Sequence, residues 1–545
     1  MKMYFQRLLV AALVIFSLQH TSSYAQVMNP ADPVVEYTGG NLQQPPFGQI
    51  ADWVKTSRLN WSTDDFKAYI YKGQIFRLKF PTSYQHNVND GKKYPIFVFF
   101  HGLGEAASPD GESFNLYDNE FHLLHGGQRH KDYVVSGKFD GFLLYMQNQF
   151  GFYGNVHYDA IAEIIQNFLV PQNKGDIDRV IVNGLSAGGS ATWDFTIRHP
   201  RLVAGCLPIS AAAPYVSNSA STLRFIPIWH FQGGRDRNPL PATSEAVGQA
   251  ILNAGGSYRY TLYPTLGHGV WNNAWAEPDY LPFLNSLHKA NPVPLFTKHE
   301  FCVGETPNVT LGLSPGFAEY QWRRNGVVIS GATGNTYNVT QYGTYDARFR
   351  RTAGGAWSEW SPKPIVVKLK DPTVPPDITT KGLMSKVIPA PDGNNGVTLS
   401  QPEGYLTYSW TRVGSSTVLS TADTLRATTA GDYVVKVTEP FGCLSEFSAP
   451  FTVINANGPN KPSPASNVVA TPISRTQMKL DWVENPAPPY NETNFEIYQS
   501  RTAGGPYKLV GITGADATTF TVNGLTEGTR YFYIIRAVNN TGASP

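Results

Sequence analysis

The chain has 545 residues, which at roughly 150 residues per domain predicts three or four domains. The 43 basic and 41 acidic residues leave a net charge of +2, so we expect no large positive field and no nucleic-acid partner. Charged residues are scarce at 15% and aromatic residues reach 13%, which fits a secreted, β-rich protein and disfavours disorder. Three cysteines cannot build a disulfide framework, so each domain is expected to rely on its packing, and the pairing of Cys206, Cys302 and Cys443 stays open.

The first 25 residues have the pattern of an export signal. Lys2 and Arg7 precede the apolar run Leu8–Leu18, and Ser23 and Ala25 supply small residues for a cut before Gln26. The alternative, a membrane anchor, needs about 20 apolar residues, which this run does not provide. We therefore expect a secreted protein (extracellular, periplasmic or at the cell surface) with no membrane span after signal removal.

Short apolar runs alternate with helical patterns from about residue 68 to residue 290. The runs Tyr94–Phe100, Gly141–Met146, Arg179–Val182, Leu202–Leu207, Phe225–Trp229 and Tyr258–Tyr263 are typical of strands buried on both faces. Between them, the apolar residues Ile161, Ile164, Ile165 and Phe168 have helical spacing. This alternation predicts a doubly wound, mostly parallel sheet with helices on both faces.

After residue 295 the helical period disappears, and alternating strands with turns predict three all-β sandwich domains. The first two resemble immunoglobulin-like modules, since each pairs a tryptophan with a tyrosine of a late strand: Trp322 with Tyr345, and Trp410 with Tyr433. Two residues after these tyrosines stand Ala347 and Val435, so an antibody-type disulfide between the sheets is not expected.

The last segment resembles a fibronectin type III module, with Trp482, Tyr531 and the strand Tyr533–Val538. It stops at Pro545, where the last strand should begin, so either the chain is a fragment or this sandwich lacks an edge strand. The predicted organisation is a signal peptide 1–25, a catalytic domain 26–292, immunoglobulin-like sandwiches 297–368 and 375–455, and a fibronectin type III module 462–545.

Gly184–Gly188 is a G-x-S-x-G pentapeptide between a predicted buried strand and a predicted helix. A serine at such a sharp turn is pushed out of the sheet with its Oγ exposed, and small neighbours permit the close approach of the chain. We interpret Ser186 as a nucleophile; the alternative is a plain glycine-rich connection.

A serine hydroxyl needs a base and a group that orients the base. Asp236 and His268 each follow a predicted strand, in the order acid and then histidine that this kind of sheet requires. Asp236 is expected to accept a hydrogen bond from His268 Nδ1–H, which leaves Nε2 to take the serine proton. The alternatives are a cap or surface ion pair for Asp236 and a loop role for His268. Asp194 and Asp178 are rival acids, but they lie too close to Ser186 in sequence.

An acyl-transfer site also needs donors for the developing oxyanion. The strand Tyr94–Phe100 ends in a glycine turn, where the backbone N–H of Leu103 is expected to act together with that of Ala187. His101, in the same turn, is interpreted as shaping the turn; a general base is the alternative.

Residues 94–290 resemble secreted esterases of the α/β-hydrolase superfamily, including carbohydrate esterase family 1, polyhydroxybutyrate-depolymerase-like esterases and predicted peptidases. The resemblance implies Ser186 as nucleophile, Asp236 as acid and His268 as base. Two residues depart from the family pattern: Gln232, where a histidine is common, and Gly269, where an aspartate is common. The matching segments are His101–Glu105, Asp118–Asn119, Gly184–Gly189, Trp193–Asp194, His199–Pro200, Ile226–Trp229, Gly233–Asp236 and Gly267–His268 with Trp271.

Aromatic residues are the candidates for substrate binding. Trp271 and Trp275 follow His268 and are expected at the rim of the site, whereas Trp193 is expected in the core. Tyr153 is a further aromatic candidate. We expect no cofactor and no metal; a site formed by His122, His125 and His130 is the weak alternative.

The leading hypothesis is a secreted serine carboxylic-ester hydrolase that removes acetyl or feruloyl-type groups from a polysaccharide or other polymeric ester. The alternatives are a peptidase or polyester depolymerase with the same triad and, from another class, a non-catalytic surface adhesin. The sandwiches are interpreted as spacers or as modules that dock onto a polymer or cell surface. The sequence leaves the acyl group, the polymer and the oligomeric state open.

Overall fold

The computed structural model describes residues 28–32, 59–72, 74–106, 120–148, 153–296 and 298–545. The predicted signal peptide lies outside these residues. The chain divides into two compact units, one of residues 1–301 and 306–368 and the other of residues 302–305 and 369–545. None of the described helices has the length and apolarity to cross a bilayer.

The first unit contains an eight-stranded sheet with the order β1-β2-β4-β3-β5-β6-β7-β8. β1 and β2 are antiparallel to their neighbours, and β4, β3, β5, β6, β7 and β8 run parallel. This is the α/β-hydrolase arrangement, so the predicted fold class is confirmed. The strands are β1 (Phe66–Tyr71), β2 (Gln74–Lys79), β3 (Tyr94–Phe100), β4 (Phe142–Gln147), β5 (Gly175–Leu185), β6 (Val203–Ile209), β7 (Ile228–Gly233) and β8 (Tyr258–Tyr263).

Two predicted strands are shifted along the chain. The fifth predicted strand was expected at Phe225–Trp229, but β7 begins only at Ile228, after Pro227. Proline has no N–H to donate to a ladder, so pairing starts beyond it. β6 likewise extends to Ile209, which brings its carboxyl end level with the serine turn, since Ile209 pairs with Leu185.

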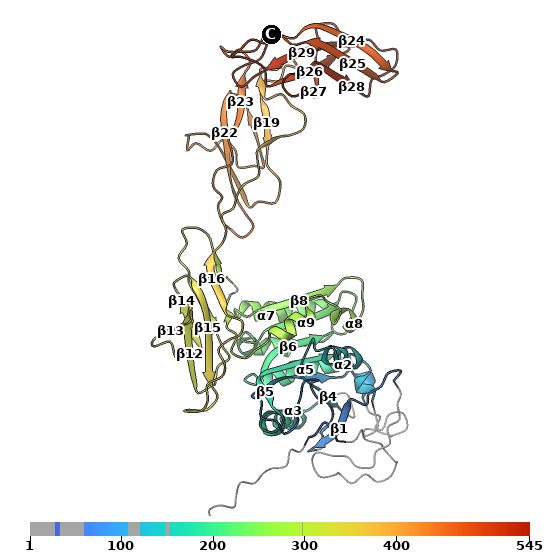
Figure 1. The fold of residues 1–545 in the computed structure, drawn as a ribbon, viewed down its shortest axis with the longest axis vertical. Coiled ribbons are helices and arrows are strands. Elements are labelled where there is room, and N and C mark those ends of the chain that lie inside the picture. Colours follow the sequence, from blue (N-terminus) through green and yellow to red (C-terminus); the bar gives the residue numbers. More distant parts are fainter. Residues whose placement is uncertain (1–27, 33–58, 73, 107–119, 149–152, 297) are drawn as a thin grey trace, which may run out of the picture. The chain divides into compact units, whose positions relative to one another are not determined.

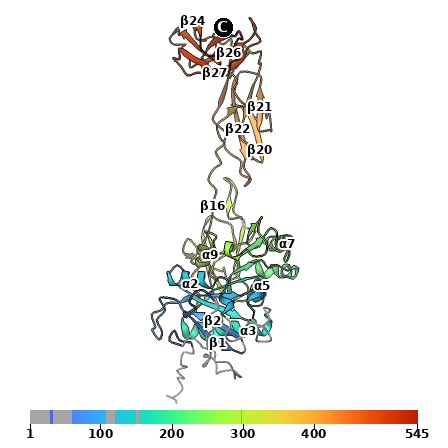
Figure 2. The ribbon, with the colours of Figure 1, turned by 90° about the vertical axis from the view of Figure 1, so that its right-hand side faces the viewer.

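Helices cover both faces of this sheet (Figures 1 and 2). One apolar core includes side chains of α3, α5 and α7, such as Ile161, Trp193 and Val247. The other includes side chains of α2, α8 and α9, such as Val134, Ala274 and Leu284. The helices are α2 (Gly127–Val135), α3 (Asn155–Glu163) continued by a π-helical segment (Ile164–Leu169) and α4 (Val170–Asn173), α5 (Ala187–Arg198), α6 (Ala220–Leu223), α7 (Pro241–Asn253), α8 (Trp271–Ala274) and α9 (Tyr280–Ser286).

A β-sandwich follows in the same unit, and its pairing begins with β9 (Val293–Pro294) against β11. Trp322 and Tyr345 are buried in its core, and the Tyr345 hydroxyl donates to the carbonyl oxygen of Gln341. Arg351 of this sandwich contacts the sheet domain, because its guanidinium lies 2.5 Å from the Asp178 carboxylate. The other strands are β10 (Glu300–Phe301), β11 (Val309–Gly312), β12 (Glu319–Arg324), β13 (Val327–Val328), β14 (Thr336–Val339), β15 (Gly343–Arg350) and β16 (Ile365–Leu369).

A segment with two Trp-Ser pairs, Trp357–Ser361, which we call the strap, runs along β15. Ser358 N–H donates to the carbonyl oxygen of Phe349, and Ser361 N–H donates to that of Ala347. The half-buried rings of Trp357 and Trp360 stack with arginines of the neighbouring strands: Arg348 lies 4.7 Å and 4.4 Å from the two ring centroids, Arg350 4.2 Å from Trp357, and Arg323 4.2 Å from Trp360. These tryptophans therefore lie outside the sandwich core.

The second unit holds two further sandwiches. In the first of them, Trp410 and Tyr433 are buried. Ser445 and Ser448 form hydrogen bonds like those of the strap, because their N–H groups donate to the carbonyl oxygens of Val437 and Val435. A disulfide joins Cys302 to Cys443, which differs from the expectation that packing alone supports each domain, and Cys206 is free and buried. The strands are β17 (Thr379–Thr380), β18 (Val387–Ile388), β19 (Val397–Ser400), β20 (Thr407–Arg412), β21 (Thr424–Ala427), β22 (Gly431–Thr438) and β23 (Phe451–Asn455).

The last sandwich has two three-stranded sheets, β24-β25-β28 and β27-β26-β29. It packs on the preceding sandwich through an apolar cluster that includes Val387, Ile454 and Val538. The buried Glu496 also accepts a hydrogen bond from Ser385 Oγ at 2.6 Å. The strands are β24 (Ser466–Ser474), β25 (Gln477–Val483), β26 (Asn494–Ser500), β27 (Lys508–Ile512), β28 (Thr519–Val522) and β29 (Phe532–Val538).

Candidate active site

Ser186 lies at the turn between β5 and α5 with φ 54° and ψ −120°. The turn has no room for side chains beside it: a Cβ on Gly184 would lie 2.3 Å from the carbonyl oxygen of Gly188. A Cβ on Gly188 would lie 2.1 Å from the carbonyl oxygen of Phe100, the last residue of β3. The glycines thus let the start of α5 rest directly on the end of β3 and hold Ser186 in a strained, outward-facing conformation.

The structure brings Ser186, His268 and Asp236 together in one hydrogen-bonded chain. His268 Nε2 lies 2.8 Å from Ser186 Oγ, and His268 Nδ1 lies 2.8 Å from Asp236 Oδ2. The Asp236 side chain is only 2% exposed, whereas that of His268 is 38% exposed. The acid is therefore shielded from water, while the base and the serine remain accessible to a substrate.

The hydrogen bonds fix the direction in which a proton can move. A carboxylate can only accept, so Nδ1 of His268 carries the hydrogen and Nε2 is free to accept the hydroxyl proton of Ser186. The backbone N–H of Asn238 donates to the other oxygen of Asp236 at 2.9 Å, which restrains rotation of the carboxylate.

The two rival acids are engaged elsewhere. Asp194 on α5 accepts hydrogen bonds from the hydroxyls of Tyr158 and Tyr215, and burial raises the pKa of this carboxyl. Asp178 pairs with Arg351 of the first sandwich. Neither is therefore available to orient His268.

Ser210 is a residue of the site that was not predicted from the sequence. It follows β6 with φ 50°, and its Oγ donates to the backbone carbonyl oxygen of His268 at 2.6 Å. Its own N–H donates to the carbonyl oxygen of Phe231 in β7. Ser210 thus ties the histidine loop to the ends of two strands. A single serine after a strand carries no distinctive sequence signal.

The expected oxyanion donors, the N–H groups of Leu103 and Ala187, each stand at the start of a helical segment. Leu103 begins a 3₁₀ turn (Leu103–Glu105) after β3, and Ala187 is the first residue of α5. The N-terminus of α5 carries the positive end of the helix dipole, which favours a developing negative charge beside Ser186.

His101 is buried below this turn. Its Nδ1 donates to the carbonyl oxygen of Gly102 at 2.6 Å, and its Nε2 accepts the N–H of Asn148 at 3.1 Å. Burial lowers the pKa of His101, so the ring is neutral. Because both nitrogens are bonded to the backbone, the ring is placed to shape the turn and has no free nitrogen for a substrate proton.

The two tryptophans after His268 have different surroundings. Trp271 is half-buried, and its ring lies 6.2 Å from that of His268 and 5.0 Å from that of His125. Trp275 is only 1% exposed, and its Nε1 donates to Asn183 Oδ1 at 3.1 Å. The expectation that Trp275 lies at the rim is therefore wrong, because its ring completes the core under the sheet. Trp193 and Tyr153 are buried as well.

Two of the three histidines that were candidates for a metal site bind different partners. His130 is bonded through its two nitrogens to the hydroxyls of Tyr145 and Tyr280, at 2.6 Å and 2.9 Å. His125 Nε2 lies 3.1 Å from a carboxylate oxygen of Glu105. His122 is buried.

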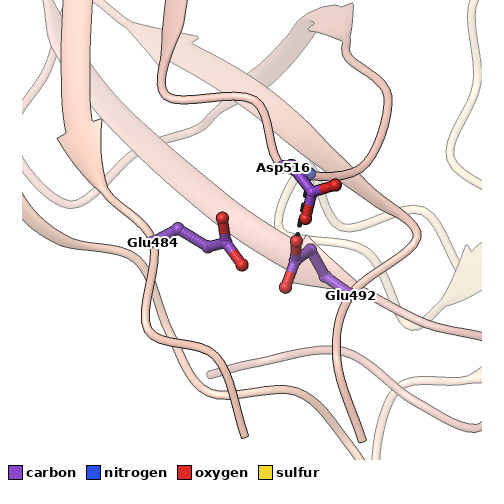
Figure 3. A group of neighbouring side chains, drawn as sticks. All are labelled: Glu484, Glu492 and Asp516. Atoms are coloured by element: carbon purple, nitrogen blue, oxygen red, sulfur yellow. Dashed lines mark hydrogen bonds between the residues drawn. The ribbon is translucent and has the colours of Figure 1, made fainter. Parts of the chain in front are cut away.

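Among the described residues, the one group of acidic, histidine or cysteine ligand atoms spaced for a metal ion lies in the last sandwich (Figure 3). It consists of Glu484, Glu492 and Asp516, with the ligand atoms within 4.8 Å of one another. The backbone N–H of Asp516 donates to the buried Glu492 carboxylate at 3.2 Å. Desolvation, followed by the charges of Glu492 and Asp516, raises the pKa of Glu484. Since carboxylates also gather on surfaces that bind no ion, the cluster alone does not define a ligand site.

Comparison with known proteins gives a family for the last sandwich. The fibronectin type III domain model matches residues 461–545. Similar solved structures include a thermostable esterase (24% identity, TM-score 0.33, covering 41% of this chain and 64% of that chain) and a ferulic acid esterase (17% identity, TM-score 0.32, 40% and 96%). An acylaminoacyl peptidase from Pyrococcus horikoshii is also similar (12% identity, TM-score 0.30, 40% of each chain). The chain thus spans about two thirds of the length of the thermostable esterase, and residues 461–545 are a fibronectin type III domain.

Proposed function

We propose that this protein is a serine carboxylic-ester hydrolase that acts through an acyl-enzyme at Ser186. The observation that carries the proposal is the hydrogen-bonded chain from Asp236 through His268 to Ser186 Oγ, with both contacts of the histidine at 2.8 Å. A nucleophile, a base and a group that orients the base are the minimum set for this chemistry.

In the proposed reaction, Ser186 Oγ attacks the ester carbonyl carbon while its proton passes to His268 Nε2. The backbone N–H groups of Leu103 and Ala187 stabilise the oxyanion of the tetrahedral intermediate. The intermediate collapses when the ester C–O bond breaks and His268 returns the proton to the leaving alcohol. A water molecule then attacks the acyl-enzyme with His268 as base, which releases the acid and restores the serine hydroxyl.

We further propose that the substrate is an acetyl or feruloyl-type ester of a polysaccharide and that the protein acts after export. Trp271 supports an aromatic or sugar-bearing substrate, since its half-buried ring lies beside His268. The amino-terminal signal pattern and the sandwich modules support a role outside the cytoplasm, where the modules would dock onto a polymer or cell surface.

The reaction class is tested with a fluorophosphonate probe and p-nitrophenyl acetate. The folded protein is expected to be labelled at Ser186 and to hydrolyse the ester, and Ser186→Ala is expected to lose both properties. Ser190→Ala, one turn along α5, is the matched control and should keep both. Folded protein that is not labelled at Ser186 would refute the proposal and leave the non-catalytic adhesin as the alternative.

The substrate class is tested by parallel assays on acetylated xylan, methyl ferulate, a short-chain polyester and a peptide library. Turnover of the first two well above the others is expected. Trp271→Ala should raise KM for these substrates, because its half-buried ring lies beside His268. Preferred cleavage of peptides or polyester would replace the carbohydrate-ester proposal while keeping the serine mechanism.

A further inference from the structure

Gln232 lies at the end of β7 with no exposed surface and contacts the acid of the triad directly. Its Nε2 donates to Asp236 Oδ2 at 2.9 Å. The same oxygen accepts the Nδ1–H of His268 at 2.8 Å. Asp236 Oδ2 therefore accepts two hydrogen bonds, one from the Gln232 amide and one from the His268 imidazole.

The orientation of the Gln232 amide follows from its partners. Because an ionised Asp236 can only accept, the amide nitrogen must face it. Ser244 on α7 donates its Oγ–H to Gln232 Oε1 at 3.0 Å, and Gln232 Nε2 lies 3.2 Å from the carbonyl oxygen of Pro239. Both ends of the amide are thus satisfied inside the protein, and a flipped amide would set its oxygen against a carboxylate.

The neighbouring arginines do not take the place of the hydrogen bond from Gln232 to Asp236. Arg235 and Arg237 flank Asp236 in the chain, but their side chains are exposed, and within the described loop neither forms an ion pair with the carboxylate. Gln232 and the N–H of Asn238 are therefore the donors that fix the acid while His268 changes its protonation state.

We propose that Gln232 is a positioning residue that holds Asp236 Oδ2 toward His268 Nδ1, with Ser244 fixing the amide that does so. The inference rests on the proposed function of the triad. Without this donor only the N–H of Asn238 restrains the carboxylate, so Asp236 Oδ2 is held less firmly toward the imidazole that faces Ser186. Since Gln232 lies behind the acid, the loss should affect the chemical step and leave ester binding unchanged.

The first test compares Gln232→Leu, Gln232→His and the exposed control Gln249→Leu in the full chain with p-nitrophenyl acetate. Gln232→Leu is expected to lower kcat by about 10- to 100-fold with little change in KM, because small misplacements of catalytic groups cost up to about 10²-fold. Gln232→His, which can still present an N–H donor, should recover most of the loss, and Gln249→Leu should match the wild type. A change confined to KM, or equal losses in the leucine and histidine variants, would overturn the inference.

The second test places a charge at the same position and does not need ester turnover. Gln232→Glu adds a carboxylate beside Asp236, and the extra negative charge favours the imidazolium form of His268. NMR titration of the His268 ring, assigned by the signal that disappears in His268→Asn, should then show protonation at a pH about 1 unit higher than in the wild type. An unchanged titration would mean that position 232 does not act on the Asp236–His268 pair. Failure of fluorophosphonate labelling in the wild type would refute the proposed function, while this titration still decides the role of Gln232.

Discussion

Gly233 and Gly267 are in direct backbone contact: a Cβ added to Gly233 would lie 1.9 Å from the carbonyl oxygen of Gly267. The loops that follow β7 and β8 are joined there by two further hydrogen bonds, from Gly234 N–H to the carbonyl oxygen of Tyr263 and from Arg235 N–H to that of Leu266, both at 2.8 Å. These loops carry Asp236 and His268. These backbone contacts between the loops therefore fix the distance between the backbones of Asp236 and His268.

Gly233→Ala should therefore separate the two loops and disturb the Asp236–His268 hydrogen bond. We expect kcat on p-nitrophenyl acetate to fall by about 10²-fold, since a displacement of about 1 Å can cost that much. Gly267→Ala is the matched control, because a Cβ there meets nothing within 4 Å. Circular dichroism checks that both variants are folded. Equal activity of the two variants would show that the loops tolerate the added carbon.

Asp236→Asn should keep the fold and lower kcat by up to about 10⁴-fold, because the amide can favour the wrong tautomer of His268. Asp194→Asn provides the comparison, since Asp194 lies on α5 but binds only Tyr158 and Tyr215 among its described hydrogen-bond partners. It should retain activity close to that of the wild type. Steady-state kinetics on a small ester measure both effects, and a fully active Asp236→Asn would place the acid elsewhere.

The sheet domain should lose stability as the pH falls below about 6.5. Burial lowers the pKa of His130 and of His230 to about 3 in the folded protein. Between these pH values the unfolded chain binds a proton at each of these two histidines that the folded chain does not, so the two together make folding less favourable by about 2.7 kcal/mol per pH unit. Urea unfolding between pH 7 and pH 5 measures the slope. His130→Gln should reduce the slope by the contribution of one proton, about 1.4 kcal/mol per pH unit, and an unchanged slope in that variant would contradict the argument.

The strap should contribute measurably to the stability of the first sandwich. Arg348→Ala removes a guanidinium that lies between Trp357 and Trp360, at 4.7 Å and 4.4 Å from their centroids. Two cation–π contacts at a half-buried site predict a loss of about 1–2 kcal/mol. Glu359→Ala, at an exposed position in the same segment, should change stability by less than about 0.5 kcal/mol. Calorimetry of the full chain measures the stability of both variants. Equal losses in Arg348→Ala and Glu359→Ala would show that the arginine–tryptophan stacking adds no stability.

The positions of Ser186, Asp236 and His268 were predictable because each follows a strand of a parallel sheet. The carboxyl ends of parallel strands meet at one edge, so residues at these ends come close even when they are far apart in sequence. The sequence therefore predicts which residues approach one another. It does not predict the partners behind them: Ser210 and Gln232 act through contacts that only the folded loops create.

Trp271 and Trp275 show why the rim of the site could not be predicted. They have similar local sequence surroundings, yet Trp275 binds Asn183 of β5 and is buried. The strap did have a sequence signal, because Arg348 and Arg350 alternate on β15 opposite two tryptophans three residues apart. The disulfide had none, since its cysteines are separated by 141 residues.

The bond between Cys302 and Cys443 closes a covalent ring of the chain that contains β11–β16 of the first sandwich and β17–β22 of the next. A protease that cuts one peptide bond between these residues would open the ring but release nothing. The half that carries Ser186 and the fibronectin type III half would travel together on a denaturing gel until a reducing agent is added.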